Sequence, residues 1–206
     1  MFITFEGIDK SGKTTQAKLL AEDLELRGYR VILTREPGGT EVAEKVAALL
    51  KDPSNRELQP IAELFLYMAS RSQHTLSLII PSLKEGKTVI SDRYSDSTLA
   101  YQGYGRGLDR GLIGELNRIA TSGLTPELTI LIDIPPEVSA ERMRLSGVPP
   151  DRLEEEGLGF LSRVREGYLR IAESEPGRFI VIDGMGDVSE IRSEIGSEVL
   201  KRLMER

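Results

Sequence analysis

The segment from Gly7 to Thr14 constrains the fold more than any other part of the chain. It reads GIDKSGKT and fits the pattern G-x-x-x-x-G-K-[ST] without a mismatch. The apolar run Phe2–Phe5 precedes it, and the predicted helix Lys13–Arg27 follows it. A glycine-rich turn between a strand and a helix is typical of the phosphate-binding loop, or P-loop, of α/β proteins.

The residue types in this loop suit the binding of a triphosphate. The glycines let successive backbone N–H groups point inward, and the start of the helix adds a partial positive charge. Lys13 would bring a full charge to the β and γ phosphates, and the Thr14 hydroxyl would ligate Mg²⁺. The alternative is a glycine-rich turn followed by Lys and Thr by chance. The predicted nucleotide-binding residues are Gly7, Ile8, Asp9, Lys10, Ser11, Gly12, Lys13, Thr14 and Thr15.

Short apolar runs alternate with longer helical stretches along the rest of the chain, which indicates β-α units that feed a parallel sheet. Runs that are apolar on both faces suit strands covered by helices on both sides. We therefore predict a doubly wound α/β fold with a five-stranded parallel sheet. The expected strands are Phe2–Phe5, Arg30–Thr34, Thr88–Ser91, Leu128–Ile134 and Arg178–Ile182. The expected helices are Lys13–Arg27, Thr40–Leu50, Pro60–Lys84, Arg110–Thr121, Pro136–Leu145, Leu158–Ser174 and Val188–Glu205.

Length and charge limit the classes of function. The 206 residues suit one domain spanning residues 1–206, and the 33 acidic and 27 basic side chains give a net charge of −6. This charge argues against a nucleic-acid partner, so any phosphate site must be local. No run of about 18 apolar residues predicts a membrane span, and no basic leader is readable. We therefore expect no membrane partner and a cytoplasmic location, which the absence of cysteine also fits.

The predicted helix Pro60–Lys84 carries apolar residues around its whole circumference. One face can pack on the sheet, and the other needs a second partner. A buried central helix and a subunit interface are both open at this point.

Asp92 and Arg93 follow the third predicted strand, at the sheet edge where open α/β folds bind their ligands. In P-loop enzymes an acid at this place holds Mg²⁺, so Asp92 joins Thr14 as a candidate metal ligand. The planar guanidinium of Arg93 could grip a second phosphate. The alternative is that the two side chains cap the strand and pair with each other.

Several separated blocks resemble the thymidylate kinase family. They are the P-loop, TREPGGT at 34–40, YMASR at 67–71, DRYSDSTLAYQG at 92–103 and DRLE at 151–154. The similarity runs from Met1 to about Asp183. It implies Mg²⁺-dependent transfer of the ATP γ-phosphoryl group to dTMP, which gives dTDP and ADP, and it implies a homodimer.

The resemblance also implies an acceptor site. In it Tyr67 stacks on the thymine ring, Arg71 binds the edge of the base, and Tyr101 leaves no room for a ribose 2′-hydroxyl. For Tyr67, ordinary core packing is the alternative. The implied substrate-binding residues are Asp9, Glu36, Pro37, Tyr67, Arg71, Arg93, Ser97, Thr98, Tyr101 and Gln102.

A glycine- and proline-rich stretch at about 142–157 corresponds to the mobile lid that closes over ATP in this family, although a solvated charged loop is the alternative. The resemblance implies that Arg142 contacts ATP. It assigns the transfer step to Lys13, Asp9, Arg93, Arg142 and Arg152. Some members supply a cation from the loop position of Lys10 and others from the lid, and this chain has both. We expect a lid arginine to face the transferred group, because a guanidinium offers fixed, branched donors.

Two other functions compatible with a P-loop stay open. One is a kinase that acts on another nucleoside monophosphate or on a deoxynucleoside. The other is a P-loop switch ATPase, which needs no second phosphate site. His74 is the only histidine, so a histidine-based nucleophile triad is excluded, and a capping role or a local hydrogen bond is expected for it.

Overall fold

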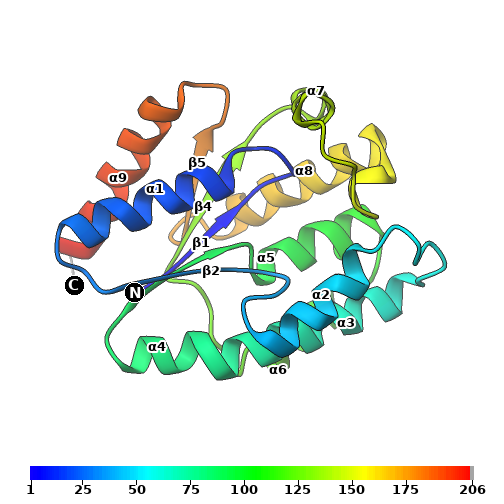
Figure 1. Ribbon diagram of the computed structural model, residues 1–206, viewed down its shortest axis with the longest axis horizontal. Coiled ribbons are helices and arrows are strands. Elements are labelled where there is room, and N and C mark those ends of the chain that lie inside the picture. Colours follow the sequence, from blue (N-terminus) through cyan, green and yellow to red (C-terminus); the bar gives the residue numbers. More distant parts are fainter. Residues whose placement is uncertain (205–206) are drawn as a thin grey trace.

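The protein is described by a computed structural model that covers residues 1–204 (Figure 1). Five strands form one sheet, in the order β2-β3-β1-β4-β5, and every neighbouring pair is parallel. This confirms the predicted five-stranded α/β fold, and each strand end lies within one residue of its prediction. The strands are β1 (Phe2–Glu6), β2 (Val31–Arg35), β3 (Thr88–Asp92), β4 (Leu128–Asp133) and β5 (Phe179–Asp183).

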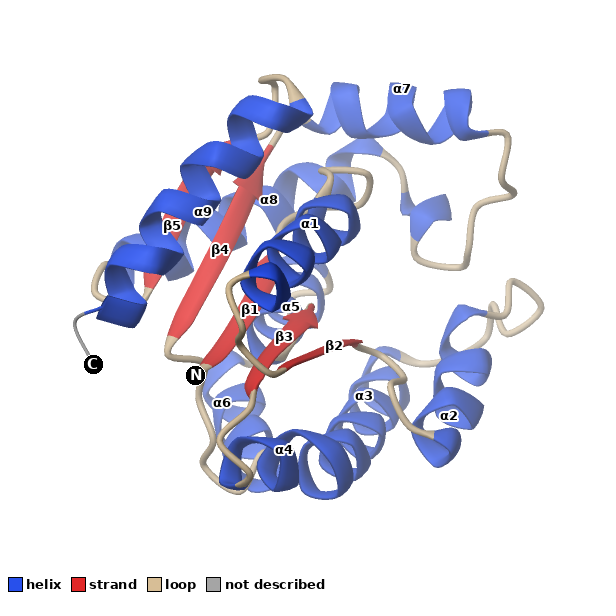
Figure 2. Ribbon diagram, turned by 60° about the vertical axis from the view of Figure 1, so that its left-hand side comes forward, coloured by secondary structure: helices blue, strands red, loops and turns tan. Residues whose placement is uncertain are grey.

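Helices cover both faces of the sheet (Figure 2). On one face α1 (Lys13–Leu26) and α9 (Val188–Met204) bury a core that includes Phe5, Leu20 and Ile195. On the other face α8 (Leu158–Ser174) packs on the π-helix η2 (Leu99–Gly105), with Tyr101, Phe160 and Val164 in its core. The other helical elements are α2 (Glu41–Lys51), α3 (Pro60–His74), η1 (Thr75–Ile79), α4 (Ile80–Lys84), α5 (Ser95–Thr98), α6 (Arg110–Ala120), α7 (Pro136–Ser146) and η3 (Glu154–Glu156).

Each predicted helix begins and ends within one residue of its prediction, apart from two features. The predicted helix Pro60–Lys84 is α3, a π-helical turn and α4 in direct succession, and the predicted end of α9 at Glu205 lies outside the described residues. No helix was predicted for 95–105, where α5 and η2 lie. This segment contains two glycines and lacks a 3.6-residue apolar period, so the sequence gives no helical signal there.

Part of the apolar surface of α3 remains exposed. Leu64 and Met68 are buried, whereas Ile61 and Phe65 are 41% and 54% exposed. Within residues 1–204, no helix combines the length and apolar character that crossing a membrane requires.

The strand order places the P-loop at a crevice in the sheet. The connection that leaves β1 leads to β2, at one edge of the sheet. The connection that leaves β3 leads to β4, on the other side of β1. The two connections therefore run in opposite directions from the carboxyl ends of the neighbouring strands β1 and β3, which is where ligands bind in such sheets. Gly7 leaves β1 with φ +139°, and a Cβ atom on it would lie 2.4 Å from the carbonyl oxygen of Ile132. Only glycine therefore lets the loop turn this closely over the end of β4.

Candidate active site

A cavity of about 540 Å³ opens at this edge of the sheet. Its size is typical of a site for small molecules. Seven basic and five acidic side chains line it, in a chain whose net charge is negative. The positive charge is therefore local, as a phosphate site requires. The basic residues are Lys10, Lys13, Arg35, Lys51, Arg71, Arg93 and Arg142.

Lys13 lies in the first turn of α1, at the bottom of the P-loop. Its Nζ donates to the Ile8 carbonyl oxygen at 2.7 Å, and its side chain is buried. Burial and the nearby charge of Arg93 lower the pKa of Lys13 to about 8, against the raising effect of Asp92 and Asp9. An anion bound at the loop would restore the favourable environment of the charged amine.

Thr14 and Asp92 meet where α1 faces the end of β3. The Thr14 hydroxyl donates to Asp92 Oδ2. Hydroxyl and carboxylate oxygens are the protein ligands that Mg²⁺ prefers, together with water and phosphate oxygens. The two residues predicted to bind the metal are therefore adjacent and chemically suited to it.

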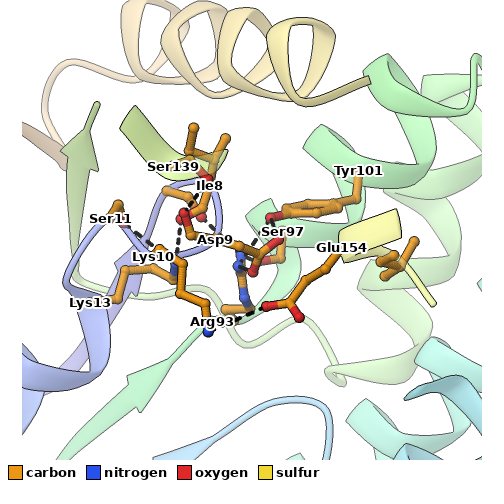
Figure 3. A network of polar contacts seen from close by, with 12 residues as sticks. Ile8, Asp9, Lys10, Ser11, Lys13, Arg93, Ser97, Tyr101, Ser139 and Glu154 are labelled. Carbon is orange, nitrogen blue, oxygen red and sulfur yellow. Dashed lines mark hydrogen bonds and ion pairs between the residues drawn. The ribbon is translucent and has the colours of Figure 1, made fainter. Parts of the chain in front are cut away.

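Arg93 joins the P-loop to the acceptor side of the cavity (Figure 3). Its Nη2 donates to Asp9 Oδ1 at 2.5 Å and to the Tyr101 hydroxyl at 3.0 Å, and its Nη1 donates to the Gly7 carbonyl at 3.0 Å. The Tyr101 hydroxyl also donates to Asp9 Oδ2 at 2.8 Å. Burial alone would raise the pKa of Asp9, but Arg93 and Lys13 outweigh it and hold this pKa below its usual value. The alternative in which Arg93 simply pairs with Asp92 is wrong.

Glu6, the last residue of β1, supports Arg93 through two hydroxyl groups that hydrogen-bond to both side chains. Its Oε2 accepts hydrogen bonds from Ser97 at 2.6 Å and from Tyr168 at 2.8 Å, and both hydroxyls also accept from Arg93. Burial, together with the nearby Asp96, raises the pKa of Glu6 to about 7. Sequence reasoning missed this acid; its only signal is a single glutamate that ends an apolar strand.

The face of α3 that carries Tyr67 and Arg71 forms another wall of the cavity. Arg71 is 1% exposed and donates to Glu36 Oε2, Thr98 Oγ1, Asn117 Oδ1 and the Tyr94 carbonyl at 2.8–2.9 Å. These bonds use four of the five guanidinium N–H groups, so at most one is available to a ligand. His74 hydrogen-bonds to Glu36 and Thr34, so it has a hydrogen-bonding role, but the expected local partner is wrong: these residues lie 38 and 40 positions away in the sequence.

Comparison with known proteins decides the family. The family model described as thymidylate kinase matches residues 5–195. The chain belongs to the thymidylate kinase family. It is 48% identical to the thymidylate kinase of Trichlorobacter lovleyi over 208 residues, with 98% of both chains covered, and 50% identical to that of Pelobacter propionicus, with 97% and 94% covered. The crystal structure of thymidylate kinase from Ehrlichia chaffeensis superposes with a TM-score of 0.79 at 41% identity, over 98% of both chains.

Most of the residues predicted from the P-loop motif, the strand end and the thymidylate kinase resemblance line this cavity. Gly7, Ile8 and Ser11 do not line it: Ile8 packs into the core beside α8, and Ser11 is buried. The carbonyls of Gly7 and Ile8 instead hold Arg93 and Lys13. The expected residues on the lining are Asp9, Lys10, Gly12, Lys13, Thr14, Thr15, Glu36, Pro37, Tyr67, Arg71, Asp92, Arg93, Ser97, Thr98, Tyr101, Gln102 and Arg142.

Arg142 and Arg152, the two lid arginines assigned to the transfer step, occupy different places. Arg142 lines the cavity, and it donates to the carbonyls of Lys10 and Gly184 at 3.1 Å, which ties α7 to the P-loop. Arg152 does not line the cavity. It is buried, its Nη1 lies 2.6 Å from Glu63 Oε2, and its Nε donates to the Leu50 carbonyl at 3.0 Å. The segment that follows α7 is therefore fastened to α2 and α3.

Other lining residues were not among the predicted site residues. Arg35 and Lys51 add positive charge from the ends of β2 and α2, and Glu154 lies 3.7 Å from Lys10 (Figure 3). Arg35 stands inside the TREPGGT block, so the sequence carried a signal for it. Asp151, Leu153 and Glu154 also line the cavity, and they stand inside the DRLE block, so the sequence carried a signal for them too.

Proposed function

We propose that this chain transfers the γ-phosphoryl group of ATP to dTMP and releases dTDP and ADP. One observation carries the proposal: a single cavity joins the P-loop residues Lys13 and Thr14 to a second wall that contains Tyr67 and Arg71. A transferase needs donor and acceptor in one space, so that the attacking oxygen and the transferred phosphorus can align. A switch ATPase has no need of the second wall.

The donor half takes ATP with Mg²⁺. Thr14 and Asp92 would hold the ion, which supplies charge that neutralises the triphosphate and fixes its orientation. Lys13 and the N-terminus of α1 would bind the phosphates directly. The buried amine of Lys13, held close to the loop, supports this assignment.

The acceptor half takes a nucleoside monophosphate. Tyr67 offers a ring for stacking, Arg71 retains one N–H for the edge of the base, and Arg93 faces the P-loop with Asp9. We assign the remaining contacts with the acceptor to Glu36, Pro37, Ser97, Thr98, Tyr101 and Gln102, all of which line the cavity.

The transfer itself is an in-line displacement without a covalent intermediate. An oxygen of the acceptor phosphate forms a bond to the γ-phosphorus as the bond to the β–γ bridging oxygen breaks, and ADP leaves. The acceptor phosphate is ionised near neutral pH, so no general base is needed. Lys13, Arg93 and Lys10 would stabilise the negative charge, and the lid at about 142–157 would exclude water.

The experiment is an ADP-release assay with Mg²⁺ and ATP, run without acceptor and then with dTMP, dUMP, dCMP, AMP or UMP. We expect turnover that depends on acceptor and is fastest with dTMP. Turnover without any acceptor would favour the switch ATPase. A preference for AMP would assign the chain to a different monophosphate kinase activity. Lys13→Met is the control for contaminating kinases, since it removes the charge that binds the phosphates.

We further propose that the chain is a homodimer. A set of apolar side chains exposed on neighbouring helices supports an interface between copies. Light scattering should give the mass of a dimer, and Phe65→Asp should give that of a monomer. Leu26→Asp is the matched control, because Leu26 is 84% exposed on α1, away from this surface. The exposed set is Val42, Leu49, Ile61, Phe65, Leu76, Leu112 and Ile119.

A further inference from the structure

Glu63 is a buried acid that no step of the proposed transfer uses. It is 0% exposed and lies in the first turn of α3. Tyr67 and Arg71 follow it at intervals of four residues, so the three side chains share one face of the helix. Glu63 therefore stands next to the wall of the cavity that would receive the base.

Three side chains from other parts of the chain donate to the Glu63 carboxylate. Gln102 Nε2 lies 2.7 Å from Oε1, Arg106 Nη2 lies 3.2 Å from Oε2, and Arg152 Nη1 lies 2.6 Å from Oε2. The two guanidinium groups neutralise the carboxylate. An ionised carboxylate only accepts hydrogen bonds, so Gln102 must turn the nitrogen of its amide toward Glu63.

This contact fixes which end of the Gln102 amide is available to a ligand. Gln102 belongs to η2 and lines the cavity together with Tyr67 and Arg71. With Nε2 held by Glu63, the carbonyl oxygen Oε1 is the other end of the amide, and it accepts no hydrogen bond from the part of the chain that the structure describes. An amide oxygen held in this orientation recognises an N–H group on its ligand.

We propose that Glu63 determines base selectivity by holding the Gln102 amide so that its oxygen accepts from the ring N3–H of a 4-oxopyrimidine. Thymine and uracil carry this N–H, whereas the N3 of cytosine is an acceptor and would face Oε1 without a proton between them. The inference rests on the proposed function and deepens it. Glu63 is a positioning residue, because it acts through Gln102. Leaving a buried polar group unpaired is what gives hydrogen-bonding sites their large selectivity.

The test compares kcat/KM for dTMP with kcat/KM for dCMP in the full-length enzyme. In Glu63→Gln the new amide can donate as well as accept, so Gln102 is free to turn over. We expect the dTMP to dCMP ratio to fall at least tenfold. The matched control is Glu156→Gln, which removes the other carboxylate bound to Arg106 and leaves the Gln102 contact intact. Its ratio should stay within twofold of wild type.

A ratio of kcat/KM values is independent of the fraction of enzyme that is folded, so a purely structural role of Glu63 would lower both constants and leave the ratio unchanged. That result would overturn the inference. Gln102→Leu provides a second test: it should lower the ratio by itself, and adding Glu63→Gln to it should cause no further fall. A wild-type ratio in Gln102→Leu also overturns the inference, even if Glu63→Gln fails to fold. Failure of the proposed function would appear separately, as wild-type enzyme without activity on dTMP.

Discussion

Arg93 Nη2 lies 2.5 Å from Asp9 Oδ1, and this ion pair fastens the end of β3 to the P-loop. The backbone of Arg93 has φ +73°, a left-handed conformation that costs a non-glycine residue about 1–3 kcal/mol. In this conformation the Arg93 side chain donates hydrogen bonds to acceptors on the P-loop, on α5, on η2 and on α8. One residue therefore contacts both the donor and the acceptor halves of the cavity.

Arg93→Lys should lower kcat/KM for dTMP by about 100-fold, a loss typical of removing a preorganised charged donor from an active site. A lysine keeps the charge but has one point of contact, so it cannot bind Asp9, Tyr101 and the Gly7 carbonyl together. Arg165→Lys is the control, because Arg165 pairs with Asp133 outside the cavity. Equal losses in the two variants would show that the fork geometry of Arg93 is unimportant.

The lowered pKa of Lys13 predicts that ATP binding takes up protons in mildly alkaline solution. Below about pH 8 the amine is charged in the free protein, and above it the amine is increasingly neutral. The triphosphate favours the charged form and raises this pKa, so affinity should weaken as the pH rises above 8. Calorimetry at pH 8.5 in buffers of different ionisation enthalpy measures the uptake directly.

Lys13→Arg is the control for this titration, since a guanidinium stays charged over the whole range. Its proton uptake on binding ATP at pH 8.5 should be absent. If the wild-type protein binds ATP at pH 8.5 without taking up protons, Lys13 is already fully charged there and the interpretation is wrong.

Local signals in the sequence were enough for the sheet and the P-loop. The strands are short apolar runs, and the loop residues lie within eight positions of one another, so neither depends on distant contacts. The segment 95–105 is different. Its helical form depends on packing against α8, where a Cβ atom on Gly105 would lie only 2.6 Å from the ring of Phe160. The sequence of this segment alone therefore does not predict that it packs against Phe160.

The difference between local signals and distant contacts also explains which parts of the site could be predicted. The family blocks located Tyr67 and Arg71, the end of the third predicted strand located Asp92 and Arg93, and all four line the cavity. The sequence did not reveal that Arg152 binds Glu63, because the two residues lie far apart in the chain and no sequence motif links them. Buried ion pairs between distant residues are set by the tertiary fold, and here one of them takes an expected catalytic cation away from the cavity.

Lys10 and Arg152 should therefore differ in single-turnover kinetics. Lys10 lines the cavity and its side chain is 31% exposed, whereas Arg152 is buried on Glu63. Lys10→Ala should slow the phosphoryl-transfer step by about tenfold, equivalent to about 1.4 kcal/mol. Arg152→Ala should act mainly on KM values, because Arg152 fastens the lid segment to α2 and holds Glu63, away from the transferred group. The opposite result would assign the transition-state role to Arg152.

Glu6 makes stability depend on pH in a direction opposite to that of most carboxylates. Its pKa is raised from 4.5 to about 7 in the folded protein, so the folded state keeps a proton that the unfolded state has lost between these values. The free energy of unfolding should therefore fall as the pH rises from about 4.5 to 7, because the charged form is the one penalised by burial. Urea denaturation at pH 5 and pH 7.5 measures the change.

In Glu6→Gln this contribution disappears, so the difference between wild type and variant isolates it from other titrating groups. Glu25→Gln, at an exposed position of α1, is the control and should retain the wild-type slope. If Glu6→Gln retains that slope too, the pKa of Glu6 is not raised on folding and the pH dependence comes from other groups.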